Sequence, residues 1–125
     1  MSMDTQRLGV AGERVAERWL VERGWVTLDR RFRSGHRDID LVMERSGTVA
    51  FVEVKTRRGA DFGGPVGAVD WRKQRELVRS AFVWVDRHGR PRTSYRFDIV
   101  GVLLAGGRAR IRHVENAFRL PFGAR

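Results

Sequence analysis

The chain has 125 residues, of which 42% are hydrophobic and 32% charged, so we expect one soluble domain that spans residues 1–125. It has no cysteine, which excludes disulfides, thiolate zinc sites and a cysteine nucleophile. It also has no apolar run near the roughly 20 residues of a membrane span and no signal-peptide pattern, so the cytoplasm is the expected location. The formal net charge of +10 favours a polyanionic partner, most commonly nucleic acid, and the alternative is a general arginine bias with no ligand behind it.

Two helices are predicted from the spacing of the apolar residues. The first spans residues 6–23, and its apolar stripe is formed by Leu8, Ala11, Val15, Trp19 and Leu20. The second spans residues 71–86 and follows Asp70, a residue type that caps helix N-termini. The inner face of this second helix would carry Trp71, Leu77, Val78, Ala81 and Val85.

Five strands are predicted from runs of β-branched and apolar residues, at 25–33, 38–44, 48–56, 94–104 and 108–114. A glycine-rich loop over residues 57–68 follows the third strand, and the tail after residue 114 is expected to be irregular. The order α-β-β-β-α-β-β favours an α/β fold, in which a mixed sheet is flanked by helices and the core spans residues 6–114.

The second and third strands are predicted to form a hairpin that turns at Ser46-Gly47. A two-residue or four-residue loop places Asp40 opposite Glu53 and Asp38 opposite Lys55, so that all four side chains share one face of the sheet. A three-residue loop would shift the register by one position and separate them. The opposite face, directed toward the core, would carry Ile39, Leu41, Met43, Ala50, Val52 and Val54.

Two carboxylates that face each other across a hairpin repel unless a cation lies between them or one is protonated. Because Mg²⁺ prefers carboxylate and carbonyl oxygens, Asp40, Glu53 and the Val54 carbonyl form a candidate site for Mg²⁺ or Mn²⁺. Lys55 could orient an attacking water or stabilise charge on a phosphate. The alternative is a solvent-facing hairpin in which Asp38 and Lys55 form an ordinary ion pair.

These residues resemble the PD-(D/E)xK nuclease superfamily, with Asp40 as its first acid and Glu53-Val54-Lys55 as its acid-x-lysine. More closely, the chain resembles the YraN-like family, also called UPF0102, whose members are predicted endonucleases. The resemblance covers residues 7–104 and implies a restriction-endonuclease-like α/β core, and it allows a homodimer because dimers are common among such nucleases. It rests on Gly12-Glu13, residues 38–41, residues 51–57, Phe62-Gly63-Gly64-Pro65, Lys73 and Arg96-Phe97-Asp98.

The resemblance also implies that Glu13 is a further acid near the metal. Helical geometry places Glu13 within about 20° of Leu20, at the margin of the apolar stripe, and an ordinary exposed glutamate is the alternative. The chain departs from the family where Arg37-Asp38 stand in place of Gly-Glu, and where Arg31 takes the place of an asparagine.

Several basic residues are candidate contacts to nucleic acid. Lys73 lies in the first turn of the second helix, where the free amides favour an anion, so it could hold a phosphate. Each basic residue taken alone is also explained as a solvated surface charge. Four arginines beside the strands are further candidates for phosphate contacts: Arg31, Arg33, Arg57 and Arg58. Asp98, by contrast, is expected to be a buried hydrogen-bond acceptor rather than a ligand.

We therefore expect a Mg²⁺-dependent endonuclease that hydrolyses DNA phosphodiester bonds, with branched or otherwise non-standard DNA as a candidate substrate. Asp40, Glu53 and Glu13 would hold the metal, and Lys55 would assist the attacking water. One alternative is a non-catalytic protein on the same fold, which would bind nucleic acid without metal and in a salt-sensitive manner. Another is a structural or partner-binding domain whose charge only keeps it soluble.

Overall fold

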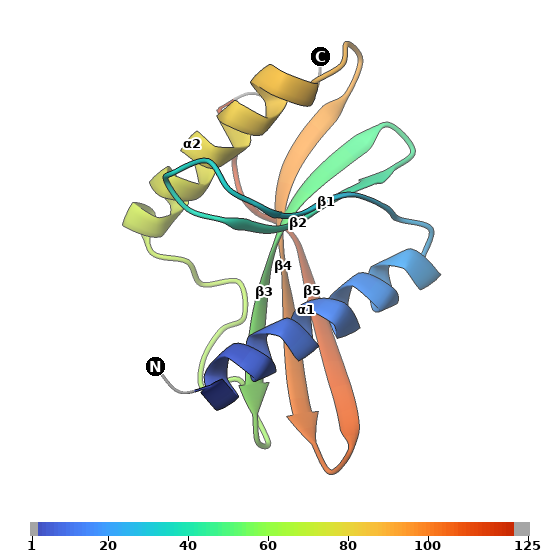
Figure 1. The fold of residues 1–125 in the computed structure, drawn as a ribbon, viewed down its shortest axis with the longest axis vertical. Helices are drawn as coiled ribbons and strands as arrows, with labels where there is room; N and C mark the ends of the chain where they lie inside the picture. The colour runs from blue at the N-terminus through green and yellow to red at the C-terminus, as the bar shows by residue number, and fades with distance from the viewer. Residues whose placement is uncertain (1–2, 122–125) are drawn as a thin grey trace.

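The computed structural model describes residues 3–121 and contains every helix and strand that the sequence predicts (Figure 1). The helices are α1 (Met3–Glu22) and α2 (Trp71–His88). The strands are β1 (Val26–Phe32), β2 (Ile39–Arg45), β3 (Thr48–Arg58), β4 (Ser94–Ala105) and β5 (Arg108–Phe118). Neither helix in this part of the chain has the length and apolar character that crossing a bilayer requires.

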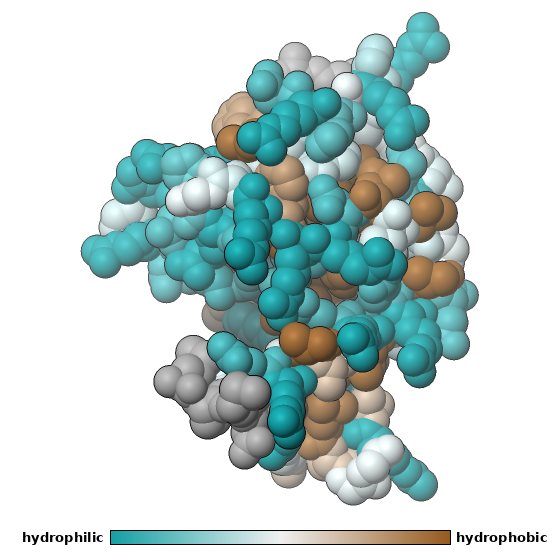
Figure 2. Space-filling model, viewed as in Figure 1, coloured by the Kyte–Doolittle hydropathy of each residue, from teal (hydrophilic) through white to brown (hydrophobic). Residues whose placement is uncertain are grey.

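The strands form one five-stranded sheet in the order β1-β2-β3-β4-β5. Strands β3 and β4 are parallel, because α2 carries the chain back along the sheet between them, and the other neighbours are antiparallel. The predicted α/β fold, a mixed five-stranded sheet flanked by helices, is therefore confirmed. Hydrophilic residues cover most of the face in Figure 2, where apolar residues appear in separate patches.

Each face of the sheet carries its own apolar core. On the α1 side, Ala16 and Leu20 pack with Leu41, Met43, Ala50 and Val52. On the α2 side, Leu77, Ala81 and Trp84 pack with Ile39, Val42, Phe51 and Phe97. The prediction that Ile39 shares a face with Leu41 is thus wrong, since Ile39 packs on the α2 side with its β1 partner Phe32. The alternation breaks at Asp40, where the side chain takes the place of a ladder bond and the adjacent Arg31 of β1 has a positive φ of 48°.

The β2–β3 hairpin turns through two residues, as predicted. Ser46 has a φ of 51° and Gly47 a φ of 80°, and positive φ at both central positions is the pattern of a type I′ turn. The pairs Val42–Phe51 and Arg45–Thr48 confirm the predicted register. Asp70 is confirmed as the N-cap of α2, since its side chain accepts a hydrogen bond from the Lys73 amide.

Three further predictions are wrong, two about packing and one about where a strand ends. Ala11 is exposed while Gly12 is buried, so the buried stripe of α1 is displaced by one residue. Trp71 is 61% exposed, because at 100° per residue it lies about 120° around the helix from the buried Leu77. Strand β5 continues to Phe118 instead of ending at residue 114, since the sheet resumes with the pair Phe97–Phe118 after a shift in register.

Gly12 brings α1 against β3, and we expect its replacement by alanine to destabilise the fold. A Cβ atom on Gly12 would lie 1.8 Å from Thr56 Oγ1 and 2.6 Å from Thr56 Cγ2. Thr56 is buried and β-branched, so it can turn away only by adopting another restricted rotamer. Gly12→Ala should lower the free energy of unfolding by about 1–3 kcal/mol, measured by urea unfolding.

Gly9→Ala on the same helix is the matched control for this substitution. No atom lies within 4 Å of a Cβ built on Gly9. Because alanine is the better helix former, this variant should be neutral or more stable by up to ~1 kcal/mol. Similar effects of the two substitutions would contradict the close contact between α1 and β3.

Candidate functional site

Strands β2 and β3 part where the two predicted acids lie. The last recorded pair between these strands is Leu41–Val52, so Asp40 and Glu53 come next on the two strands. Instead of a further ladder bond, Asp40 Oδ2 accepts a hydrogen bond of 2.8 Å from the Val54 amide. The carboxylate of Asp40 therefore lies between the two strands, at the start of their divergence.

Glu53 is a buried carboxylate, with 7% of its surface exposed. Its Oε2 atom forms an ion pair with Lys73 Nζ at the start of α2. No described residue gives this oxygen a hydrogen bond of good geometry, so the ion pair is the contact that compensates its burial. A buried carboxylate oxygen in this state is a position that a metal ion can fill.

Asp40 is strongly affected by its surroundings. Burial is the largest cause that raises the pKa of Asp40 to about 7, and the negative charges of Glu53 and Glu13 raise the pKa further. The hydrogen bond from the Val54 amide and the positive charge of Lys73 act in the opposite direction. Glu13 on α1 and Glu53 on β3 therefore both act on the same carboxyl group. Like charges gathered around a partly buried acid are characteristic of sites that accept a cation.

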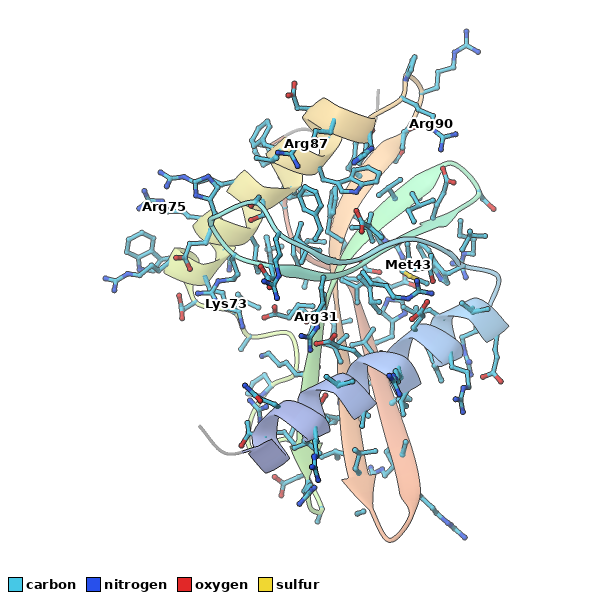
Figure 3. The ribbon with its side chains drawn as sticks, viewed as in Figure 1. Arg31, Met43, Lys73, Arg75, Arg87 and Arg90 are labelled. Atoms are coloured by element: carbon cyan, nitrogen blue, oxygen red, sulfur yellow. The ribbon has the colours of Figure 1, made fainter. Side chains whose placement is uncertain are left out.

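Glu13 reaches this region from α1 and pairs with Arg31, whose Nε lies 3.1 Å from Glu13 Oε1. Arg31 lies on β1 between Arg30 and Phe32, which pair with Leu41 and Ile39 of β2, so it stands beside Asp40. Its φ of 48° lies in the left-handed region, which asparagine adopts more readily than arginine. Figure 3 labels Arg31 near α1 and Lys73 near the start of α2.

Lys55 contacts the glycine-rich loop rather than a carboxylate. Its Nζ donates a hydrogen bond of 2.6 Å to the Ala68 carbonyl. Burial lowers the pKa of Lys55, and the neighbouring Lys73 ammonium lowers it further. Asp38 is exposed and lies 3.5 Å from Arg33, so the alternative in which Asp38 pairs with Lys55 is wrong.

The acids at this site form a two-carboxylate set. Within residues 3–121, no group of three or more His, Cys, Asp or Glu side chains lies close enough together to hold a metal ion. Mg²⁺, however, keeps several waters and is often bound by one or two carboxylates together with substrate phosphates. Asp40 and Glu53 fit such an ion, because it would ligate the buried Glu53 oxygen and favour the charged form of Asp40.

The predicted phosphate contacts lie in different places. Arg31 and Lys73 are at the acids, where each is paired with a glutamate. Arg57 is two residues after Lys55 on β3 and so lies on the same face of the sheet. Arg33 and Arg58 lie away from the acids: the first pairs with Asp38, and the second lines a separate surface pocket beside α1.

A serine that sequence reasoning missed fixes the approach to Asp40. Ser80 is buried on α2; its hydroxyl donates to the Arg37 carbonyl at 2.6 Å and accepts from the Arg37 amide at 3.2 Å. Arg37 also forms an ion pair of 2.5 Å with Glu76. The loop before β2 is thereby fastened to α2, and the available signal was a serine within an otherwise apolar helix face.

Asp98 is confirmed as a buried hydrogen-bond acceptor. It has no exposed surface and accepts from the Asn116 amide at 2.9 Å, with His113 Nε2 at 2.7 Å from its other oxygen. Arg96 completes its partners. The group joins β4 to β5 where their register shifts, which accounts for this acid without a ligand.

Comparison with known proteins places the chain among relatives of similar length. A UPF0102 protein of Bifidobacterium longum subsp. infantis is 41% identical over 120 residues, which cover 94% of this chain and 97% of that protein. A UPF0102 protein of Trichlorobacter lovleyi is 40% identical over 119 residues, with 94% of each chain covered. The solved structure of Pyrococcus furiosus SfsA in complex with Ca²⁺ is similar at a TM-score of 0.40 and 18% identity, covering 89% of this chain and 63% of that chain. The model of the uncharacterised protein family UPF0102 matches residues 12–102, and the chain belongs to that family.

Proposed function

We propose that this UPF0102 protein is a cytoplasmic, metal-dependent endonuclease that hydrolyses DNA phosphodiester bonds. The observation that carries the proposal is the meeting of Asp40 and Glu53 where β2 and β3 part, with a buried Glu53 oxygen that has an ion pair to Lys73 but no hydrogen bond. Lys55 follows Glu53 by two residues on the same face of β3. The net charge of +10 supports a polyanionic substrate. The likeness of Asp40 and Glu53-Val54-Lys55 to the PD-(D/E)xK pattern supports this chemistry.

Asp40 and Glu53 would hold the metal, with the Val54 carbonyl and Glu13 as further candidate ligands. A bound Mg²⁺ or Mn²⁺ supplies charge neutralisation at the phosphate and makes a water more acidic. Lys55 would direct its ammonium group to the phosphate or the attacking water in exchange for the Ala68 carbonyl. Lys73 would exchange its ion pair with Glu53 for a phosphate contact in the first turn of α2.

The proposal is tested with purified protein and linear, nicked, flapped and four-way DNA, with Mg²⁺ or Mn²⁺ and with EDTA. We expect cleavage only with metal, and a loss of more than about 100-fold in Glu53→Gln. Calorimetric titration should show Mn²⁺ binding to the wild type that Glu53→Gln lacks. Glu44→Gln, four residues from Asp40 on β2, should behave as wild type. Metal-dependent cleavage that survives in Glu53→Gln would reject this site.

A second candidate function is nucleic-acid binding without catalysis. The ion pairs Lys73–Glu53 and Arg31–Glu13 favour it, because they compensate two of the acids without a metal. This function predicts salt-sensitive DNA binding in EDTA that Glu53→Gln leaves intact, together with no cleavage by the wild type.

A further inference from the structure

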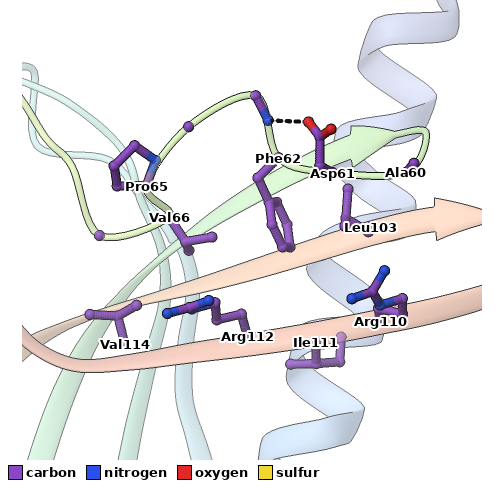
Figure 4. A pocket seen from close by; sticks show the side chains of 13 residues that line it. Ala60, Asp61, Phe62, Pro65, Val66, Leu103, Arg110, Ile111, Arg112 and Val114 are labelled. Atoms are coloured by element: carbon purple, nitrogen blue, oxygen red, sulfur yellow. Dashed lines mark hydrogen bonds between the residues drawn. The ribbon is translucent and has the colours of Figure 1, made fainter.

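A groove lies beneath the glycine-rich loop on the same face of the sheet as Lys55 (Figure 4). Its volume is about 910 Å³, and β5, one of the two edge strands of the sheet, forms part of its floor. We call it the loop groove. It is lined by residues 60–67, Leu103, Arg110, Ile111, Arg112 and Val114.

The strand register connects the loop groove to the candidate metal centre. Lys55 on β3 pairs with Gly101 on β4, and Gly101 pairs with Arg112 on β5. Residues paired in this way share a face, and two strand spacings separate the backbones of Lys55 and Arg112 by about 10 Å. Arg110 lies two residues further along the same face, and Figure 4 shows its side chain directed toward the loop and that of Arg112 lying along the strand toward Val114.

Gly101 allows the loop to rest on β4 and form the roof of the groove. A Cβ atom at this position would lie 2.8 Å from Phe62 Cε1 and 3.0 Å from Val66 Cγ1. Phe62 and Val66 therefore pack directly onto the strand where a larger residue would displace them. They give the groove an apolar wall that faces the two arginines of β5.

The two arginines of the groove lack an ion-pair partner within the part of the chain that the structure describes. There, neither Arg110 nor Arg112 has an ion pair or hydrogen bond from its exposed side chain, whereas Arg30, Arg31 and Arg37 each pair with a glutamate. The acid of the lining, Asp61, accepts a hydrogen bond of 2.8 Å from the Gly63 amide within its own loop.

Unpaired arginines beside an aromatic wall match the chemistry of single-stranded nucleic acid, whose phosphates bind cations and whose bases pack on apolar rings. The volume resembles that of pockets for small ligands, about 300–1,000 Å³, so it suits a short single-stranded stretch and not a duplex. We infer that the loop groove binds an unpaired strand that continues from the phosphate at the metal ion that Asp40 and Glu53 would hold. This rests on the proposed function, since the strand in the groove is taken to be the one that is cleaved.

The test measures binding in EDTA by fluorescence anisotropy, with a single-stranded oligonucleotide and a blunt duplex over a range of salt concentrations. Arg110→Ala/Arg112→Ala should weaken single-strand binding at least tenfold and change duplex binding less than twofold. The slope of log affinity against log salt should become shallower by about 1.4, since each single-strand phosphate contact contributes about 0.7. The control, Arg7→Ala/Arg108→Ala, removes the same charge from exposed residues of another pocket and should change neither affinity by more than twofold.

Equal losses in the two double variants, or equal losses for single strand and duplex, would overturn the inference. Displacement of the oligonucleotide by polyglutamate at the same charge concentration would also overturn it, because the groove would then suit an acidic protein. Cleavage of flapped DNA with Mg²⁺ separates the two proposals. If the wild type cuts DNA in a Glu53-dependent way but the two double variants bind single strands equally well, only the groove inference fails. If Arg110→Ala/Arg112→Ala loses single-strand binding but the wild type cuts no DNA, only the nuclease proposal fails.

Discussion

Asp40→Asn is expected to reduce DNA cleavage by more than about 100-fold and, at the same time, to stabilise the metal-free protein above pH 7. Cleavage falls because asparagine removes a charged metal ligand. Stability rises because the charged form of Asp40 is unfavourable in the folded protein without metal. Opposite signs for activity and stability are expected of a residue kept for chemistry rather than for folding.

The pH dependence follows from the position of this carboxyl group. Burial raises the pKa of Asp40 from its ordinary 3.8 to about 7, so between these values the folded protein retains a proton that the unfolded chain has released. The resulting loss of stability is absent below about pH 4 and complete above about pH 7. Asp40→Asn should remove it, adding up to about 4 kcal/mol to the free energy of unfolding at pH 8 and little at pH 4.

Urea unfolding in EDTA at pH 4, 6 and 8 measures this effect, with the exposed neighbour variant Asp38→Asn as control. A wild-type protein whose stability does not fall across this range relative to Asp40→Asn would contradict the assignment. Because metal binding requires the deprotonated carboxylate, Mn²⁺ affinity and cleavage by the wild type should both rise with pH up to about 7.

Lys73→Met is expected to make the stability of the protein depend on metal. The substitution keeps much of the apolar stem but leaves the buried Glu53 without its ion-pair partner. We expect the metal-free variant to lose about 1–3 kcal/mol, less than a fully buried pair would cost because Lys73 is partly exposed. Mn²⁺ should restore the lost stability, since the metal ion no longer competes with the Lys73 ammonium group for the Glu53 oxygen.

Thermal unfolding with and without Mn²⁺ and calorimetric titration measure both parts of this prediction. The Mn²⁺ affinity of Lys73→Met should exceed that of the wild type by about tenfold, which corresponds to 1.4 kcal/mol. Arg75→Met on the same helix, whose guanidinium lies 5.3 Å from the exposed Trp71 ring, should show neither change. Equal Mn²⁺-induced stabilisation of wild type and Lys73→Met would rule out competition between lysine and metal.

Local patterns predicted the features that depend on chain neighbours. The two-residue turn at Ser46-Gly47 fixed the hairpin register, and with it the neighbouring positions of Asp40 and Glu53. Asp70 was predicted as a cap because its type and its place before an apolar periodicity are local signals. The PD-(D/E)xK resemblance added Glu13, which periodicity alone placed only at the margin of a helix face.

Features that depend on long-range packing could not be predicted in this way. Periodicity does not reveal how closely a helix approaches a sheet, so the direct contact between Gly12 and Thr56 was missed. The partners of the two lysines, Glu53 for Lys73 and Ala68 for Lys55, depend on where α2 begins in space. Arg112 lies near Lys55 only because β3 and β4 pair in parallel, a pairing that no local pattern specifies.

The two outer strands also determine how this sheet meets other molecules. An unpaired strand edge invites aggregation by adding a strand from another chain. On β5 the alternating Arg108, Arg110 and Arg112 would bring like charges together if two copies joined edge to edge. On β1 the irregular register between Thr27 and Asp29 interrupts the ladder that a joining strand would need. The arginines of β5 thus keep the protein soluble at the same sheet edge where they favour the binding of polyanions.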